Sequence, residues 1–138
     1  MNQSKSSKYA IRSILYLARQ EPGLLATLER IAESQKIPRH FLAKIMQRLV
    51  RKRLVKSVKG PNGGFVLSVP ADKITLYAIL DAVDDLSMSM QDCFLGYGAC
   101  SESERCLAHD AWKELREKEL AFFENLTIGK MLSVESTT

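Results

Sequence analysis

Hydrophobic residues recur every three to four positions over much of the first half of the chain, which is the spacing of amphipathic helices. This pattern predicts one helix over 9–19 and a second over 28–35, which Thr27 can cap with its hydroxyl. A third helix follows Pro38, a residue suited to a first helical turn. Its apolar stripe is the clearest in the chain and consists of Phe41, Leu42, Ile45, Met46, Leu49 and Val50.

The opposite face of this third predicted helix is polar and cationic. Two helices joined by a tight turn, the second with such a face, form a helix-turn-helix. In that motif the second helix places its first residues against base edges in the major groove of DNA. The residues expected on this recognition face are Arg39, His40, Ala43, Lys44, Gln47, Arg48 and Arg51.

Two β-rich runs, 54–59 and 65–69, surround a turn made of Gly, Pro and Asn. This order predicts a β-hairpin, and a hairpin that follows a helix-turn-helix is the wing of a winged helix. Lys56 and Lys59 approach the tip of this wing, where they could contact phosphate or a minor groove. The expected fold class is therefore mainly α with a small β-hairpin.

The second half of the chain contains two further predicted helices with an irregular segment between them. Thr75 can cap a helix over 76–83, and a longer amphipathic helix is expected from about 107 to 125, before a short segment at 128–134. We interpret the longer helix as a dimerisation helix, the alternative being that it packs on its own domain. The predicted organisation is a winged-helix domain at 1–84, a cysteine-bearing loop at 85–106, and a dimerisation helix with a C-terminal segment at 107–138.

Charge divides the chain into two parts. Residues 1–60 carry 14 Lys and Arg against 3 Asp and Glu, a net charge of +11, whereas residues 61–138 carry 6 against 13, a net charge of −7, which accounts for the +4 of the whole chain. A basic half beside an acidic half favours a polyanion as the partner of the basic half. The residues expected to contact double-stranded DNA are Lys5, Lys8, Arg39, His40, Lys44, Arg48, Arg51, Lys56 and Lys59.

Several classes of protein are disfavoured by what the sequence lacks. No apolar run approaches the roughly 20 residues of a membrane helix, and the polar start has no signal-peptide core, so a cytoplasmic protein without membrane partners is expected. There is no Ser/His/Asp order, no phosphate-binding Gly-rich loop and no carboxylate pair placed in an apparent cleft, so we expect no enzymatic activity. An electron-transfer or cluster-carrier protein would lack the recognition helix and the wing.

All three cysteines of the chain, Cys93, Cys100 and Cys106, lie within 14 residues, and His109 follows three positions later. Thiolates and imidazole are ligands of iron–sulfur clusters and of zinc, and two glycines between the first two cysteines let the loop fold back. If the next helix begins near residue 105, Cys106 and His109 share a helix face. A zinc site, a thiol-only redox switch and unrelated buried thiols are the alternatives to a cluster, and His109 could instead be a surface or helix-packing histidine.

Several segments resemble one known family. They are Lys8–Arg12, Leu42–Leu54, the wing Leu54–Phe65 with its Gly-Pro-Asn-Gly-Gly-Phe turn, and Ile74–Asp84, which are similar to bacterial winged-helix regulators of the iron–sulfur cluster regulator (IscR) type. The likeness covers nearly the whole chain, and the wing turn is its most specific element. The cysteine loop together with Cys106-Leu-Ala-His-Asp-x-Trp112 matches the cluster-binding branch of that family.

The resemblance implies a homodimeric transcription regulator that binds a pseudo-palindromic operator, with repression as the expected mode of action. It implies that an iron–sulfur cluster, 2Fe–2S or else 4Fe–4S, controls operator affinity in response to iron–sulfur status, redox state or nitric oxide. By position, Cys93, Cys100 and Cys106 would be ligands and His109 the fourth. Relatives that sense nitric oxide can take an acidic ligand from the N-terminal helix of the partner subunit. The matching residue here is Lys8, which favours His109 and a 2Fe–2S cluster.

Two features depart from the family pattern. The gap between Cys93 and Cys100 is one residue longer than is common, and the recognition helix carries His40, Ala43 and Lys44 where the type member has a hydroxyl, an acid and an amide. Because Ala43 has no hydrogen-bonding group with which to read a base, the operator sequence is expected to differ. The alternative function is a thiol-based, redox-sensing transcription regulator without a cluster.

Overall fold

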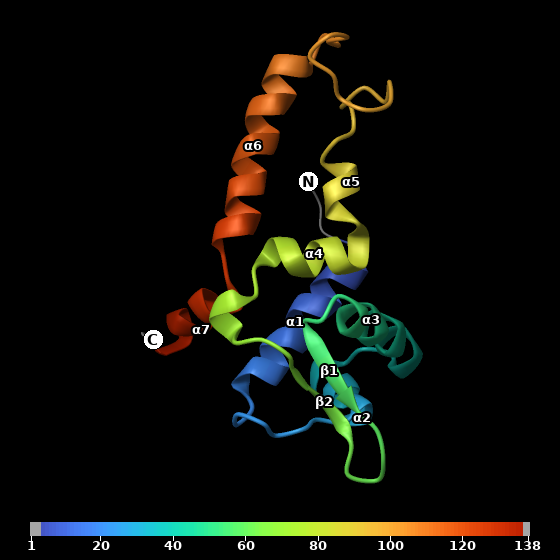
Figure 1. The fold of residues 1–138 in the computed structure, drawn as a ribbon, viewed down its shortest axis with the longest axis vertical. Helices are drawn as coiled ribbons and strands as arrows, with labels where there is room; N and C mark the ends of the chain where they lie inside the picture. Colours follow the sequence, from blue (N-terminus) through green and yellow to red (C-terminus); the bar gives the residue numbers. More distant parts are fainter. Residues whose placement is uncertain (1–3, 137–138) are drawn as a thin grey trace.

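A computed structural model describes residues 4–136 of the chain. It consists of helices and one two-stranded antiparallel sheet, so the fold class predicted from the sequence is confirmed (Figure 1). The elements in chain order are α1 (Lys5–Arg19), α2 (Leu28–Gln35), α3 (Arg39–Arg51), β1 (Val55–Val58), β2 (Gly64–Leu67), the 3₁₀ turn η1 (Ala71–Lys73), α4 (Leu76–Asp84), α5 (Leu86–Ser89), α6 (His109–Asn125) and α7 (Ile128–Ser136).

The first three helices form close to the predicted places, and α1 and α2 begin at residues whose side chains cap them. The hydroxyl of Thr27 accepts a hydrogen bond from the backbone N–H of Arg30, which satisfies one of the free donors at the start of α2. The helix α3 begins directly after Pro38, as expected. The predicted start of α1 was four residues too late, because Ser4 caps the helix by accepting a hydrogen bond from the N–H of Ser7.

The core of the winged-helix body lies between α1, α3 and α4 and includes the predicted apolar stripe of α3. The buried members of this stripe, each at most 3% exposed, are Leu42, Ile45, Met46 and Leu49. The helix α7 returns to the same core, since Ile128 has no exposed surface and its N–H donates to the carbonyl of Ile74 at 2.9 Å. The body therefore contains both the N-terminal and the C-terminal helix of the described chain.

The wing is attached to the helix-turn-helix through its backbone. Ala26, just before α2, and Phe65 in β2 exchange two backbone hydrogen bonds of 3.0 and 2.7 Å. Val58 lies opposite Gly64 in the hairpin, and a Cβ atom on Gly64 would lie only 2.7 Å from the carbonyl oxygen of Ala26. This close approach requires glycine, which gives the Gly-Gly of the wing turn a packing role.

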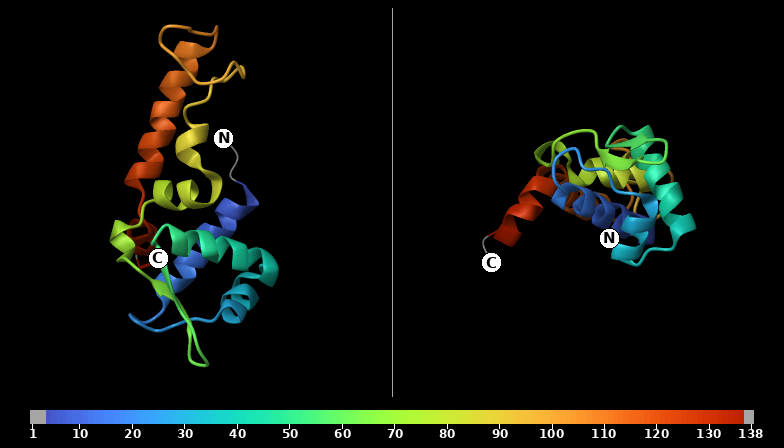
Figure 2. Two further views of the ribbon diagram at one scale, coloured as in Figure 1. Left: turned by 45° about the vertical axis from the view of Figure 1, so that its right-hand side comes forward. Right: turned by 90° about the horizontal axis from the view of Figure 1, so that it is seen from below.

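The helix α6 extends from the body on the side opposite the wing, and the loop 90–108 lies around its far end (Figures 1 and 2). Near the body Phe123 is 5% exposed and packs in one cluster with Leu80 and Leu86. Elsewhere on α6 large apolar side chains are exposed, Leu115 at 51% and Phe122 at 56%. The helix thus packs on its own domain over only part of its surface.

Two features of the second half differ from the prediction. The helix α6 begins at His109, two residues later than expected, and Leu107 before it is fully exposed. The short helix α5 forms at the start of a segment predicted to be irregular, because Leu86 is buried there against α4 and α6. Among the described helices, none combines the length and the apolar character needed to cross a membrane.

Candidate DNA-binding surface and cysteine site

The outer face of α3 and the wing carry the exposed cations that the sequence predicted. The predicted basic residues that are exposed on α3 and the wing are Arg39, Lys44, Arg48, Arg51, Lys56 and Lys59. His40 is also exposed, while Ala43 is partly buried. The start of α1 lies beside this face, since Ser6 lines a hollow of about 200 Å³ together with Lys44 and Arg48. Lys5 and Lys8 are exposed in the first two turns of α1. The start of α1, the helix α3 and the wing therefore all present side chains that suit contact with phosphates.

Two predicted DNA contacts have partners inside the protein. Nε of Arg39 lies 2.9 Å from Oε1 of Glu29 in an ion pair whose members are both more than half exposed. Nη1 of Arg48 donates a hydrogen bond of 2.6 Å to the carbonyl oxygen of Val83. That carbonyl lies in the last turn of α4, where the helix itself supplies no donor, so Arg48 links the recognition helix to the end of α4.

The end of α4 also receives the start of α1. Oδ2 of Asp84 accepts hydrogen bonds from the hydroxyls of Ser4, at 2.7 Å, and of Ser7. Ser7 is fully buried, and a carboxylate at a helix N-terminus is favoured by the helix dipole. The first turn of α1, the recognition helix and the last turn of α4 thus meet at one junction, directly before α5 and the cysteine loop.

The cysteine loop folds back on itself, as the two glycines predicted. The N–H of Cys93 donates to the carbonyl of Gly98 at 2.8 Å, and that of Cys100 donates to the carbonyl of Gln91 at 2.6 Å. Gly96 and Gly98 have φ values of 84° and 94°, in the left-handed region that favours glycine. These turns bring the first two cysteines of the chain to one end of the loop.

Trp112 holds the loop against α6. Its indole Nε1–H donates to the carbonyl of Asp92 at 3.2 Å, and its ring centroid lies 5.3 Å from that of Phe94. The ring therefore joins one turn of α6 to the segment next to Cys93. Trp112 ends the motif that resembles the cluster-binding branch, and in the structure it faces the cysteine loop.

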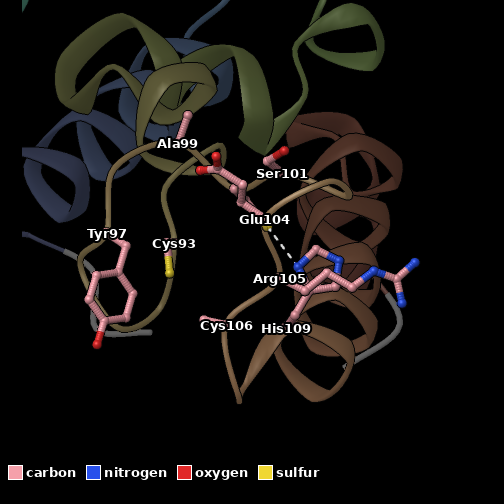
Figure 3. Close-up of a pocket in the computed structure, with 9 residues that line it drawn as sticks. Cys93, Tyr97, Ala99, Ser101, Glu104, Arg105, Cys106 and His109 are labelled. Atoms are coloured by element: carbon pink, nitrogen blue, oxygen red, sulfur yellow. Dashed lines mark hydrogen bonds between the residues drawn. The ribbon is translucent and has the colours of Figure 1, made fainter.

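All three cysteines and His109 line one hollow of about 330 Å³ between the loop and the start of α6 (Figure 3). The thiols are free and partly exposed, whereas His109 is only 3% exposed. Sγ of Cys100 lies 3.5 Å from Nδ1 of His109. Within residues 4–136, no three Cys, His, Asp or Glu side chains converge closely enough to hold a single metal ion.

The expectation that Cys106 and His109 share a helix face is wrong. The helix α6 begins at His109, because residues 106–108 form a turn in which the N–H of His109 donates to the carbonyl of Cys106 at 3.1 Å. Both side chains still line the same hollow, so they lie close together although they do not belong to one helix.

The environment of Cys93 favours its thiolate form. The pKa of its thiol is lowered by hydrogen bonds from the backbone N–H of Tyr97 first, with further ones from Leu95, from Gly96 and from the thiol of Cys106, while partial desolvation acts in the opposite direction. The thiolate is the form of cysteine that binds metals and attacks electrophiles. Cys93 and Cys106 are thus close neighbours although 12 residues separate them in the sequence.

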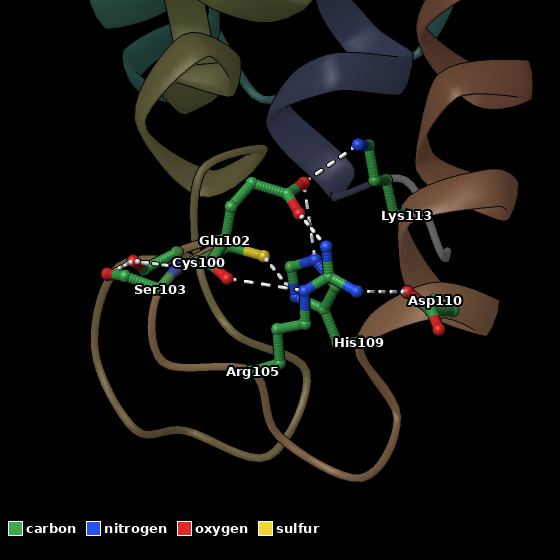
Figure 4. Close-up of polar contacts among 8 residues, drawn as sticks. Cys100, Glu102, Ser103, Arg105, His109, Asp110 and Lys113 are labelled. Carbon is green, nitrogen blue, oxygen red and sulfur yellow. Dashed lines mark hydrogen bonds and ion pairs between the residues drawn. The ribbon is translucent and has the colours of Figure 1, made fainter.

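A polar network that sequence reasoning missed surrounds the other side of His109 (Figure 4). Oε1 of Glu102 lies 2.7 Å from Nζ of Lys113 and 3.4 Å from Nε2 of His109, and Oε2 lies 2.7 Å from Nη2 of Arg105. The 3.4 Å contact is an ion-pair distance without hydrogen-bond geometry, and Nε2 is buried with no hydrogen-bond partner. The contacts with Lys113, above all, and with His109 and Arg105 lower the pKa of Glu102 to about 2. No periodic pattern marks Glu102, because it lies in an irregular loop.

The likeness to known proteins extends over almost the whole chain. Residues 3–133 match the model of the Rrf2 family, which is described as an iron-dependent transcriptional regulator. The chain belongs to the Rrf2 family. Over 134 residues it is 38% identical to an HTH-type transcriptional regulator of Aquifex aeolicus, covering 96% of this chain and 92% of that one. Over 133 residues it is 32% identical to the HTH-type transcriptional regulator IscR of Klebsiella pneumoniae, covering 96% and 80%.

A solved structure supports the fold of this Rrf2-family chain. CymR, the global cysteine regulator of B. subtilis, matches it with a TM-score of 0.81 and 22% identity, covering 97% of this chain and 98% of that one. The resemblance to IscR-type regulators inferred from the sequence is confirmed, and the chain is an Rrf2-family transcriptional regulator. None of these likenesses identifies the chemistry of the cysteine site, which therefore has to be argued from its own residues.

Proposed function

We propose that the chain is a homodimeric repressor whose affinity for a pseudo-palindromic operator is controlled by an iron–sulfur cluster. The observation that carries this proposal is the convergence of Cys93, Cys100, Cys106 and His109 on one hollow. The four side chains come from an irregular loop and a helix start that have no other evident role in the winged-helix body. The relationship to IscR of Klebsiella pneumoniae supports the same assignment.

The residues of the hollow fit an iron–sulfur cluster. Three free thiols and one imidazole match the ligand types that such clusters take, and the lowered pKa of Cys93 favours the thiolate that ligation requires. A cluster of several iron and sulfide atoms accepts ligands that are farther apart than those of a single zinc ion, which agrees with the open arrangement of these side chains. With three thiolates and one imidazole, we favour 2Fe–2S over 4Fe–4S. A bound cluster would supply a group that responds to iron supply, redox state or nitric oxide.

The DNA-contacting residues of the proposal lie on α3 and the wing. His40 and Lys44 lie on the N-terminal half of the recognition helix, where base edges are reached, and Lys56 and Lys59 lie on the wing. Each phosphate contact releases counterions from DNA, so binding is expected to weaken steeply with salt. Arg51, Lys5 and Lys8 extend the same basic surface.

The homodimer of the proposal would use the exposed side of α6. Leu115 and Phe122 are each more than half exposed there, and the helix extends beyond the body. The two residues are seven positions apart and so lie on one face of the helix, where adjoining exposed apolar side chains favour contact with a partner. Because a dimer reads half-sites about 34 Å apart, the spacing of its two recognition helices determines its affinity.

The structure offers a short route by which the cysteine site could influence DNA binding. The loop continues α4 and α5, and the last turn of α4 is bonded to the recognition helix through Arg48 and to α1 through Asp84. A change in the order of residues 93–106 would therefore act on the position of the end of α4. Arg48 serves in this proposal as the link between the two regions.

The experiment compares operator binding by cluster-loaded protein, cluster-free protein and the variant Cys93→Ala. DNA is first selected from a random duplex library by protein purified without oxygen, and affinities for the selected site are then measured by fluorescence anisotropy. We expect the loaded protein to bind with an affinity clearly different from that of the other two. Ser103→Ala, a change in the same loop outside the hollow, serves as the matched control and should behave as wild type. Equal affinities in all forms would contradict control by a cluster.

A second candidate function is a thiol switch without a cluster, favoured by the contact between Cys93 and Cys106. A hydroperoxide would take two electrons and two protons from these thiols, with its O–O bond breaking to give a disulfide, an alcohol and water. Colourless, iron-free protein that forms this disulfide and thereby changes its operator affinity would support the switch. Protein that carries iron and inorganic sulfide and responds only when they are lost would support the cluster.

A further inference from the structure

His109 is buried between two different groups. Its side chain is 3% exposed, and its two ring nitrogens face opposite sides of the site (Figure 4). Nδ1 lies 3.5 Å from Sγ of Cys100, on the side of the hollow, whereas Nε2 lies 3.4 Å from Oε1 of Glu102. The ring therefore stands between the thiol site and a carboxylate.

Glu102 is held in place by two cations. Nζ of Lys113, one turn along α6 from His109, lies 2.7 Å from Oε1, and Nη2 of Arg105 lies 2.7 Å from Oε2. Arg105 also reaches Asp110 at 3.6 Å and donates from Nε to the backbone carbonyl of Glu102 at 3.2 Å. The carboxylate is thus positioned by contacts on both of its oxygens, in a segment that has no regular secondary structure.

The chemistry of the two groups determines which nitrogen of His109 carries the proton. A neutral imidazole has one N–H donor and one nitrogen lone pair, and a carboxylate only accepts hydrogen bonds. A carboxylate that faces Nε2 therefore favours the proton on Nε2 and leaves the lone pair on Nδ1, directed to the hollow. A buried ring nitrogen without a partner is costly, and a small rotation that directs the Nε2–H at Oε1 would turn the 3.4 Å contact into a hydrogen bond.

We propose that Glu102 is a positioning residue that holds His109 in the tautomer protonated at Nε2 and so presents Nδ1 to the cysteine hollow. Histidine ligands commonly donate their second N–H to a carboxylate, which fixes the orientation of the ring. The role of Nδ1 as a cluster ligand rests on the proposed function. The tautomer itself does not, because it follows from the contacts of the cluster-free chain.

The first test uses cluster-free protein labelled with ¹⁵N in its histidines and records two-bond ¹H–¹⁵N correlations at a pH where both imidazoles are neutral. The chain has two histidines, and the exposed His40 serves as the internal reference. We expect one dominant tautomer for His109, with the proton on Nε2. In Glu102→Gln this preference should weaken to a mixture, because an amide can donate as well as accept. Glu104→Gln changes the same residue type in the same hollow without contacting His109 and should leave the spectrum unchanged.

The outcomes separate a positioning role from a structural one. A proton on Nδ1 in the wild type, or a tautomer that is the same in Glu102→Gln, would overturn the proposal. Circular dichroism confirms that each variant is folded, and Lys113→Gln, which loosens Glu102 without removing it, should give an intermediate shift.

The second test connects the tautomer to the proposed function. In cluster-loaded protein, Glu102→Gln should shorten the lifetime of the visible absorption in the presence of an iron chelator, because losing such a supporting carboxylate usually lowers metal affinity by about 10- to 100-fold. Glu104→Gln should not change it, and an unchanged lifetime in Glu102→Gln would overturn the link. Failure of the wild type to assemble any cluster would contradict the proposed function and leave the tautomer result standing.

Discussion

The winged-helix body and the cysteine loop are held together in different ways. The body has a continuous core in which Ile14, Leu42 and Leu49 have no exposed surface, and α1, α2 and α4 begin with side-chain caps. The loop 90–108 has little apolar burial, and large side chains such as Tyr97 remain largely exposed, Tyr97 at 79%. Turns, the Trp112 contact and the network around Glu102 hold it instead.

This difference indicates that the body and the loop have different stabilities. Apolar burial is a large and non-directional source of stability, so the body is expected to keep its shape whether or not the loop is ordered. Polar contacts in an exposed loop contribute little each, so the loop is expected to be less stable than the body. The proposed function uses both properties, because the part that reads DNA would stay folded while the part proposed to sense a signal changes.

The largest expected effect tests this difference in stability directly. Leu49→Ala removes a fully buried side chain from the body and should lower the free energy of unfolding by about 2–5 kcal/mol, through lost burial and the cavity left behind. Leu107→Ala makes the same chemical change at a fully exposed position next to the loop and should alter it by less than about 0.5 kcal/mol. Urea unfolding of cluster-free protein, followed by circular dichroism, measures both.

If Leu107→Ala lowered the free energy of unfolding almost as much as Leu49→Ala, the loop region would be packed as firmly as the body. The difference in stability between the two regions would then be wrong. Repeating the measurement over a range of protein concentrations separates burial within one chain from burial in a dimer. Only the latter depends on concentration.

Much of the body could be predicted from the sequence because its signals are local. The stripe from Phe41 to Val50, the caps at Thr27 and Thr75, and the glycine turn of the wing each act within a few residues, and each predicted element is present. The start of α1 was missed because Ser4 lies among polar residues, with no apolar periodicity to mark a helix there.

Residue type and spacing predicted which segment holds the candidate site, but not the contacts within it. Clustered cysteines identified the segment, but the contacts of Glu102 with Lys113 and His109 depend on how an irregular loop folds against α6. The same is true of Arg48, whose charge and position predicted a DNA contact. Its hydrogen bond to the carbonyl of Val83 depends on the tertiary fold and could not be predicted from the sequence.

A smaller effect is expected at the junction between the two regions. Arg48→Met keeps the apolar stem but removes the hydrogen bond to the carbonyl of Val83. This should lower the free energy of unfolding by about 1–2 kcal/mol, a small value for a charged donor because Arg48 is partly solvated. It should also reduce the difference in operator affinity between cluster-loaded and cluster-free protein. Unfolding in urea and anisotropy titrations measure the two quantities.

Arg51→Met is the matched control, because Arg51 is exposed on the same helix one turn nearer its end. We expect it to weaken operator binding and reduce its salt dependence without changing stability by more than about 0.5 kcal/mol. If Arg48→Met behaves in the same way as Arg51→Met, then Arg48 is a DNA contact, and the link between the loop and the recognition helix fails.

The smallest effect concerns the ion pair between Arg39 and Glu29 on the DNA-binding face. Glu29→Gln releases Arg39 for a phosphate and should raise operator affinity by at most about fivefold, since an ion pair this exposed is strongly screened by solvent. A backbone hydrogen bond at the start of α2, then Arg39, lowers the pKa of Glu29 below its ordinary value of 4.5. The pair is therefore fully formed above that value and is lost only as the pH falls through the lower pKa of the folded state, so the gain should be constant between about pH 6 and 8. The gain in operator affinity should also be the same with and without the cluster, because this ion pair lies within the body. A gain seen in only one form would show that the loop influences the DNA-binding surface beyond the end of α4.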